Sequence, residues 1–351
     1  MTYKVAIVDA ASDFEVHNAV NSAIDLVGGF SPKEKSKVVI KPNLCSGRKP
    51  PGSGATTRVT VVDALISYVN EQNSSCEILV VEGDSDRSAD EAFRRLGYRE
   101  LGKKYDNVHL VNLSKDKTVK IVLDKSKKLT AIEVPESLLF ADYFVSVANL
   151  KRQVNERMTG VWKNQWGCLP HKAIRMRLHP FLSEALFDVN SVFWPDLCII
   201  DGVVGLEGAG PIEGTPKQVG KILCSKDPLA IDVVAAKIIG EAPKSIPHLN
   251  YALKQLHRRP NDITIIGDRI ESMNFKFITK RQYLLYRSSL RLRKAAEYLE
   301  NAGYASSILA YALRAVGFSE LTEGKMFSWK RMFQIGKDLL FKVEAAERAF
   351  G

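Results

Sequence analysis

The sequence has no apolar run long enough to cross a membrane, since none approaches the roughly 18 to 20 residues that a spanning helix needs. Its N-terminus, MTYKVAIVDA, begins like a strand. It lacks the basic segment followed by an apolar segment that marks a signal peptide. We therefore expect a cytoplasmic protein.

Cysteines are few and scattered. The five of them are odd in number, widely spaced and contain no C-x-x-C pair. This pattern argues against a disulfide framework and against a zinc or iron–sulfur motif local in sequence. A metal site would have to be assembled from distant residues, so a divalent metal is left open as a cofactor and none is assigned.

Acidic residues are outnumbered, with 40 Asp and Glu against 50 Lys and Arg, a formal charge of +10 and a pI near 9.2. Such a surplus favours an anionic partner. The alternatives are a metabolite that carries phosphate or carboxylate, an anionic lipid surface, and a nucleic acid. The last is less favoured, because no RNA-binding signature is present.

Composition and periodicity indicate a soluble α/β protein. The 351 residues are 45% hydrophobic and 26% charged, and buried strand patterns alternate with amphipathic helix patterns. We predict a mostly parallel sheet with helices on both faces. Strands are expected at 3–10, 37–43, 76–84, 108–113, 119–123, 130–135, 141–151, 195–203 and 220–225, with helices at 13–27, 57–72, 88–98 and 228–240.

The chain changes character near residue 270. We predict an α/β domain over 1–270, with two lobes around a cleft as one arrangement, and an all-helical region over 271–351. The latter holds 14 Lys and Arg against 8 Asp and Glu. Packing on the α/β domain or on a second subunit is one interpretation of this basic region, and docking on an anionic membrane is another.

Polar residues collect where the predicted strands end. In a parallel sheet these ends meet at one edge, where ligands bind. Turns need Asn, Asp and Gly in any case, so a single cluster means little. The candidates at strand ends are Lys41, Asn43, Glu82, Asp84, Lys151 and Asp201.

Two further segments contribute candidates. Residues 205–216, GLEGAGPIEGTP, are expected to form a loop whose Gly208 and Gly210 let the backbone approach an anion. An ordinary wide turn is the alternative. No nucleotide-binding fingerprint is present.

Residues 159–179, TGVWKNQWGCLPHKAIRMRLH, follow neither helix nor strand periodicity. We expect Lys163 and Asn164 to bind an anion between Trp162 and Trp166, whose rings reduce local water. His171 and His179 are candidates for proton transfer, although a histidine is more often structural. Cys168 is a weaker candidate nucleophile.

Several of these blocks together resemble a known family. The blocks VVIKPNLC, GATTRVTVVDALI, ILVVEGDS, VANLK, TGVWKNQWGCLP, PDLCIIDGVVGLEGAGPIEG and ILCSKDPLAIDVVAAKIIG occur in the order of the domain of unknown function 362 family. The resemblance covers about residues 37 to 242. It implies the α/β fold and no particular reaction.

Two departures limit what the resemblance implies. Many relatives carry a cysteine-rich ferredoxin-like module, and this sequence has no such cluster, so we expect no iron–sulfur cluster. Relatives commonly read Lys-x-His where this chain reads Lys151-Arg152-Gln153, so a histidine that could act as a ligand or acid–base group is absent at that position.

More distantly, residues 56–96 resemble the N-terminal domain of the nickel-pincer lactate racemase family. As an analogy of fold, this resemblance favours a cleft.

The sequence supports two hypotheses about function. The first is an enzyme that holds an anionic metabolite with Lys41, Arg58, Lys151 and Lys163, assisted by Asn43, Asn164, Trp166, Gly208 and Gly210. Its proton-transfer or metal-binding groups would be Glu82, Asp84, His171 and Asp201. The second is a non-catalytic binding protein that docks through its basic helical tail on a membrane or nucleic acid. Clustered strand-end residues favour the enzyme.

Overall fold

The computed structural model describes residues 2–269 and 271–279. Of these, residues 2–178, 182–269 and 271–277 belong to one compact unit with one large sheet. The helices predicted for 271–351 fall almost entirely outside the described residues, so that region and its boundary stay predictions. No helix of the described part is long and apolar enough to cross a membrane.

The large sheet has nine strands in the order β11-β1-β10-β9-β7-β2-β3-β4, with β8 paired to β7. The strands β4, β3, β2, β7 and β9 run parallel, while β10 is antiparallel to both of its neighbours. The strands are β1 (Tyr3–Asp9), β2 (Lys37–Pro42), β3 (Glu77–Glu82), β4 (Val108–Asn112), β7 (Tyr143–Gln153), β8 (Arg157–Thr159), β9 (Leu197–Ala209), β10 (Glu213–Ser225) and β11 (Ile263–Gly267). The predicted mostly parallel sheet is confirmed.

A separate hairpin pairs β5 (Thr118–Val122) with β6 (Ala131–Pro135). The α-helices are α1 (Asp13–Leu26), α2 (Val59–Gln72), α3 (Ala89–Arg95), α4 (Leu101–Lys104), α5 (Glu136–Leu139), α6 (Val161–Asn164), α7 (Lys172–Leu178), α8 (Leu182–Val192), α9 (Pro228–Ile238) and α10 (Pro247–Gln255). Short 3-10 turns are η1 (Tyr98–Glu100), η2 (Gln165–Cys168), η3 (His179–Phe181) and η4 (Pro243–Ser245).

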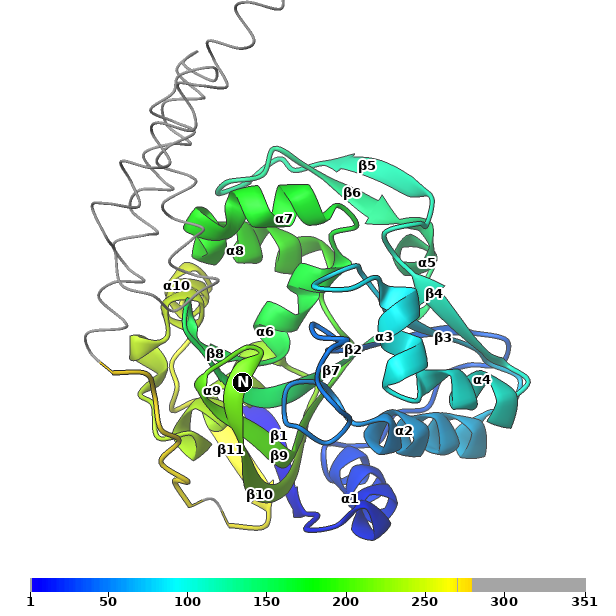
Figure 1. Cartoon of the computed structure of the whole chain (residues 1–351), viewed down its shortest axis with the longest axis horizontal. Helices are drawn as coiled ribbons and strands as arrows, with labels where there is room; N and C mark the ends of the chain where they lie inside the picture. Colours follow the sequence, from blue (N-terminus) through cyan, green and yellow to red (C-terminus); the bar gives the residue numbers. More distant parts are fainter. Residues whose placement is uncertain (1, 270, 280–351) are drawn as a thin grey trace, which may run out of the picture. The chain divides into compact units, whose positions relative to one another are not determined.

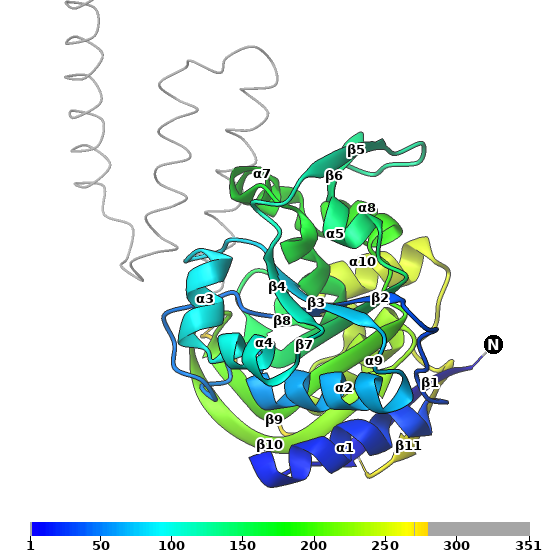
Figure 2. The same ribbon diagram turned by 90° about the vertical axis from the view of Figure 1, so that its right-hand side faces the viewer.

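Two hydrophobic cores cover the two faces of the large sheet. Alternate side chains of a strand point to opposite faces, so Val39 of β2 joins one core while Val38 and Ile40 join the other. Helices α1, α2 and α3 cover one face, and α6, α8, α9 and α10 cover the other. Figures 1 and 2 show α1 and α2 side by side on their face. The predicted two-sided cover is confirmed.

The prediction of a loop over residues 205–216 was wrong. Strands β9 and β10 continue through it as an antiparallel pair from Cys198 opposite Ser225 to Ala209 opposite Glu213, and Figure 2 shows their curved course. Only residues 210–212 connect them. Glycines and prolines signal turns, but ladder hydrogen bonds to a long partner strand override that local signal.

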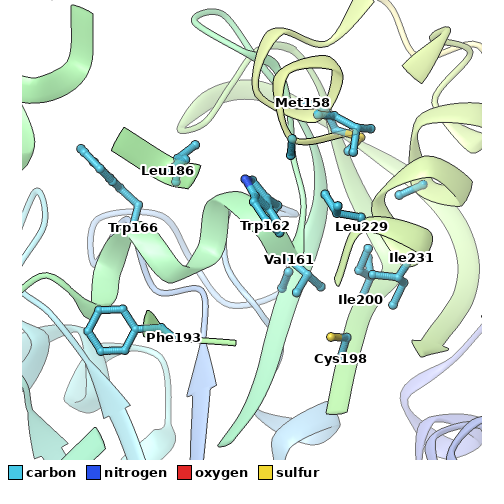
Figure 3. Close-up of a cluster of buried hydrophobic side chains, with 14 of the residues drawn as sticks. Met158, Val161, Trp162, Trp166, Leu186, Phe193, Cys198, Ile200, Leu229 and Ile231 are labelled. Atoms are coloured by element: carbon cyan, nitrogen blue, oxygen red, sulfur yellow. The ribbon is translucent and has the colours of Figure 1, made fainter. Parts of the chain in front are cut away.

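The segment without periodicity, 159–179, folds into short helical pieces that are held by their tertiary contacts. Trp162 lies in the core, and Figure 3 shows its indole among Met158, Leu186 and Leu229. Trp166 is also buried, farther along the same segment. The rings predicted to wall a ligand therefore contribute to the hydrophobic core.

Candidate functional site

A buried ion pair lies at the carboxyl ends of β2 and β3. The Lys41 ammonium is 2.7 Å from Glu82 Oε1, and the two side chains are 1% and 6% exposed. Lys41 also donates to the Pro42 carbonyl and to Asn164 Oδ1. Backbone N–H groups of Leu44 and Gly83 donate to Glu82. Each charge is therefore fully hydrogen-bonded, as a buried charge requires.

Two asparagines connect this pair to the neighbouring strand β7. Asn43 donates to Asn164 Oδ1 over 3.1 Å, and Asn164 donates to the Lys41 carbonyl and to the hydroxyl of Ser146. All four side chains are buried. Segments about 120 residues apart in the chain thus form one polar network. It joins Lys41 and Asn43, which are strand-end candidates, to Asn164, which is a candidate from the 159–179 segment.

Lys151 extends the network and brings in a thiol. Its ammonium donates to Asn43 Oδ1 at 2.8 Å and to the Ala55 carbonyl at 2.7 Å, and it lies 3.2 Å from Cys45 Sγ. No carboxylate of the described residues is hydrogen-bonded to this fully buried lysine. Cys45 is partly exposed, and the network reaches the surface there.

Lys163 is the cation with the fewest contacts at this site. Within the described ranges, no hydrogen bond or ion pair joins its partly buried ammonium to another residue. Desolvation lowers the pKa of Lys163 to about 8, and the charges of Lys151 and Arg175 act in the same direction, opposed by Cys45 and Glu156. The Lys163 ammonium is therefore left without a hydrogen-bonded carboxylate in the described residues.

The helix that carries Lys163 and Asn164 is held by a buried carboxylate. Asp232 of α9 accepts hydrogen bonds from the N–H groups of Val161 and Trp162, at 2.7 and 3.0 Å. Burial raises the pKa of Asp232 to about 6, although these bonds and His248 lower it. A β-carbon on Gly160 would lie 2.1 Å from Asp232, so only glycine fits there. Asp232 positions the site without belonging to it.

Gly167 and Arg175 close the network from the side of η2 and α7. A β-carbon on Gly167 would lie 2.6 Å from Glu82 Oε1 and 2.8 Å from Lys41 Nζ. Buried Arg175 donates to the Asp84 carbonyl. Desolvation lowers the pKa of Arg175, while the charge of Glu82 raises it.

Asp201 lies close to this network but has its own partners. Its carboxylate accepts from the N–H of Arg58 at 2.8 Å and from that of Val203 at 3.1 Å. Desolvation raises the pKa of Asp201 to about 6, although the Arg58 interactions lower it. The Arg58 side chain turns away to Asp13, 2.6 Å from its Oδ1. Residues 55–58 link Asp201 to Lys151 through backbone atoms only.

The structure places Asp84 and His171, two other candidates, outside the network. Asp84 Oδ1 accepts from the Ala89 N–H and from Asn112, which holds the turn before α3. His171 is exposed and lies 2.5 Å from Glu133 of β6. His179 begins the 3-10 turn η3.

Gly208 and Gly210 lie where β9 ends and the β9–β10 hairpin turns. Gly208 has φ +83°, and its N–H donates to the Lys276 carbonyl. A β-carbon on Gly210 would lie 1.9 Å from the Arg152 carbonyl. These glycines allow close backbone packing, and no contact of theirs joins the lysine network.

Sequence reasoning missed Cys45 and Arg175. Cys45 stands two residues after Asn43, so its place behind the β2 strand end was the available signal. Arg175 belonged to a segment with several arginines and no period. Cys168, the thiol that the sequence did suggest, is fully buried, and desolvation raises its pKa to about 12. Burial disfavours the thiolate there.

No group of three or more His, Cys, Asp or Glu side chains that could hold a metal ion occurs among the described residues. The open alternative of a divalent metal therefore gains no support from them. The chemistry available at the site is that of lysines, one arginine, two carboxylates, amides and a thiol.

Comparisons with known proteins give three findings. A family model described as "Domain of unknown function (DUF362)" matches residues 38–237, more than half of the chain. Thylakoid-associated protein sll1697 of Synechocystis sp. is 28% identical over 240 residues, which are 65% of this chain and 71% of that protein. The lactate racemase apoprotein of Thermoanaerobacterium thermosaccharolyticum matches with a TM-score of 0.41 and 9% identity. That match covers 68% of this chain and 57% of the racemase, less than two thirds of its length.

Proposed function

The chain belongs to the DUF362 family, and we propose that it is an enzyme whose substrate is an anionic metabolite bound where β2, β3 and β7 end. The metabolite carries a phosphate or carboxylate group. Lys163 and Lys151 provide the attraction, and Asn43 and Asn164 hold these groups in place. The reaction class is left unassigned.

The observation that carries the proposal is that the Lys163 ammonium has no hydrogen bond or ion pair within the described residues. Two ammonium groups, those of Lys151 and Lys163, lie near each other without a carboxylate hydrogen-bonded to either in the described residues. Desolvated cations without counter-charges are costly. A bound anion would supply the missing counter-charge, with charge-assisted hydrogen bonds of the kind lysines make to phosphate and carboxylate.

Acid–base chemistry would come from carboxylates beside this anion. Asp201, with its pKa raised to about 6 by burial, can exchange a proton near neutral pH. Glu82 is held by Lys41 at 2.7 Å, and a ligand that draws Lys41 away would free it to accept a proton. Cys45 adds a partly exposed thiol at the same place.

Binding of inorganic phosphate and of malonate tests the proposal, measured by isothermal titration calorimetry at pH 7 and low salt. Lys163→Met should weaken binding by about 1.5 to 3 kcal/mol, roughly 10- to 150-fold, the scale of a charge-assisted hydrogen bond. The matched control is Lys237→Met, which removes an exposed lysine on α9. Its affinity should equal that of the wild type.

The pH dependence has a definite sign. An anion prefers the protonated form of Lys163, so affinity should fall as the pH rises through the lysine's pKa of about 8. Lys163→Met should abolish that inflection. Equal affinities for Lys163→Met and the wild type would refute the assignment. A wild type that binds neither inorganic phosphate nor malonate would also refute it.

A further inference from the structure

The β5–β6 hairpin carries a concentrated positive charge on a sheet separate from the large one. Residues 115–130 contain six lysines and two aspartates. Lys117, Lys120 and Lys125 are exposed, and none of the three forms an ion pair within the described ranges. One aspartate, Asp116, is engaged by Ser137. The positive charge of the hairpin is thus largely free to meet a partner.

Apolar side chains lie among these lysines. Val122 is 71% exposed and Ile174 of α7 is 42% exposed. Between the hairpin and α7 lies a pocket of about 110 Å³. Its apolar lining is Leu129, Ala131, Ile132, Leu169, Pro170 and Ile174, and its polar lining is Lys120, Glu133 and His171.

The register of the hairpin places Lys120 and Val122 on one face, beside the lining of the pocket. Lys120 lies opposite Glu133, and Val122 lies opposite Ala131. Side chains two residues apart on a strand share a face, so Val122 extends the apolar lining outward from Ala131. We call the exposed side chains of Lys117, Lys120, Val122, Lys125 and Ile174 the hairpin surface.

We propose that the hairpin surface docks the protein on a bilayer that contains anionic lipids. The lysines would meet lipid headgroups through charge attraction, with their stems along the interface. Val122 and Ile174 would enter the headgroup region. Exposed aliphatic side chains next to lysines are the combination that interfacial binding uses.

Two observations favour a bilayer over the other occupants of such a surface. A peptide that added a strand to β5 would meet Lys120 within that strand and Lys117 just before it, and lysines on an edge strand disfavour strand addition. The pocket, at about 110 Å³, is smaller than the roughly 300 Å³ at which small-molecule sites begin. It has room for a short apolar group.

Co-sedimentation of the full chain with lipid vesicles tests the proposal. The wild type should bind vesicles of phosphatidylcholine with 30% phosphatidylglycerol, in a salt-sensitive way, and should not bind pure phosphatidylcholine. The triple variant Lys117→Glu, Lys120→Glu and Lys125→Glu should lose at least about 100-fold in affinity, since each lysine near an anionic surface contributes about fivefold.

The matched control reverses three exposed lysines on other elements: Lys237→Glu, Lys244→Glu and Lys254→Glu. It changes the net charge equally and should bind within threefold of the wild type. The double variant Val122→Ser and Ile174→Ser keeps every charge and should bind about tenfold more weakly. Thermal unfolding of each variant verifies that it folds.

Three results would overturn the proposal. The first is a wild type that does not bind anionic vesicles. Binding to polyglutamate without binding to vesicles counts as this result, because it would show that the surface takes an acidic peptide and not a bilayer. The second is a hairpin triple variant that binds as well as the wild type. The third is an equal loss in both triple variants, which would mean that net charge, or a surface elsewhere in the chain, determines binding.

Discussion

Removal of one partner of the Lys41–Glu82 pair should leave the other as an uncompensated buried charge. The two single losses in the free energy of unfolding should therefore add up to more than the loss in the double variant. Lys41→Met leaves the Glu82 carboxylate almost without solvent and with only two backbone donors, from Leu44 and Gly83. An uncompensated buried charge of this kind costs about 3 to 5 kcal/mol. Glu82→Gln retains one side-chain oxygen that can accept a hydrogen bond, so it should cost about 1 to 3 kcal/mol of the free energy of unfolding.

The double variant replaces both charges by neutral groups of similar size. Its loss in the free energy of unfolding should be smaller than the sum of the single losses by about 1 to 3 kcal/mol. Urea unfolding, followed by circular dichroism, measures the wild type, the two single variants and the double variant, which together form a double-mutant cycle. If Lys41→Met does not fold, recovery of a folded protein in the double variant carries the same information.

An exposed pair of the same type provides the control. Lys103 and Glu100 lie 2.8 Å apart but are 72% and 68% exposed. The cycle of Lys103→Met and Glu100→Gln should show a coupling of at most about 0.5 kcal/mol. Additive losses at Lys41 and Glu82, within 0.5 kcal/mol, would contradict the reasoning that burial makes this pair interdependent.

Two further predictions concern the same network. Gly167→Ala should cost about 1 to 3 kcal/mol of stability and weaken phosphate binding, because its β-carbon would overlap Glu82 and Lys41. The control Gly102→Ala should cost little, since the nearest atom to its β-carbon would be 3.5 Å away. Equal thermal midpoints for both variants would count against this. Iodoacetamide should alkylate Cys45 first under native conditions, since the other four thiols are buried, and peptide mass spectrometry that found another cysteine labelled earlier would exclude it.

Much of the fold follows from patterns of single segments. Helix α1 was predicted to within one residue, because its amphipathic pattern begins at Asp13 and Gly28 follows its end. The parallel strands were predicted because each is a short apolar run, as strands buried on both faces must be. The β9–β10 hairpin was not predicted, since its ladder joins segments whose local composition indicates turns.

The candidate site was predictable in part for the same reason. Strand topology alone brings Lys41, Glu82 and Lys151 to one edge, so their positions in the sequence sufficed to select them. The contacts of Arg175 with the Asp84 carbonyl and of Lys151 with Cys45 depend on how loops and short helices fold over that edge. Those paths have no period in the sequence, and tertiary packing determines them.

The protonation of Lys163 tests the central claim most directly. Competitive labelling of lysines with acetic anhydride over a range of pH, read by mass spectrometry, gives the midpoint of this one amine with and without inorganic phosphate. We predict a midpoint near the pKa of about 8 in the free protein and a higher one when phosphate is bound, because the anion favours the ammonium. An ordinary lysine midpoint of about 10.4 that phosphate does not move would contradict the account.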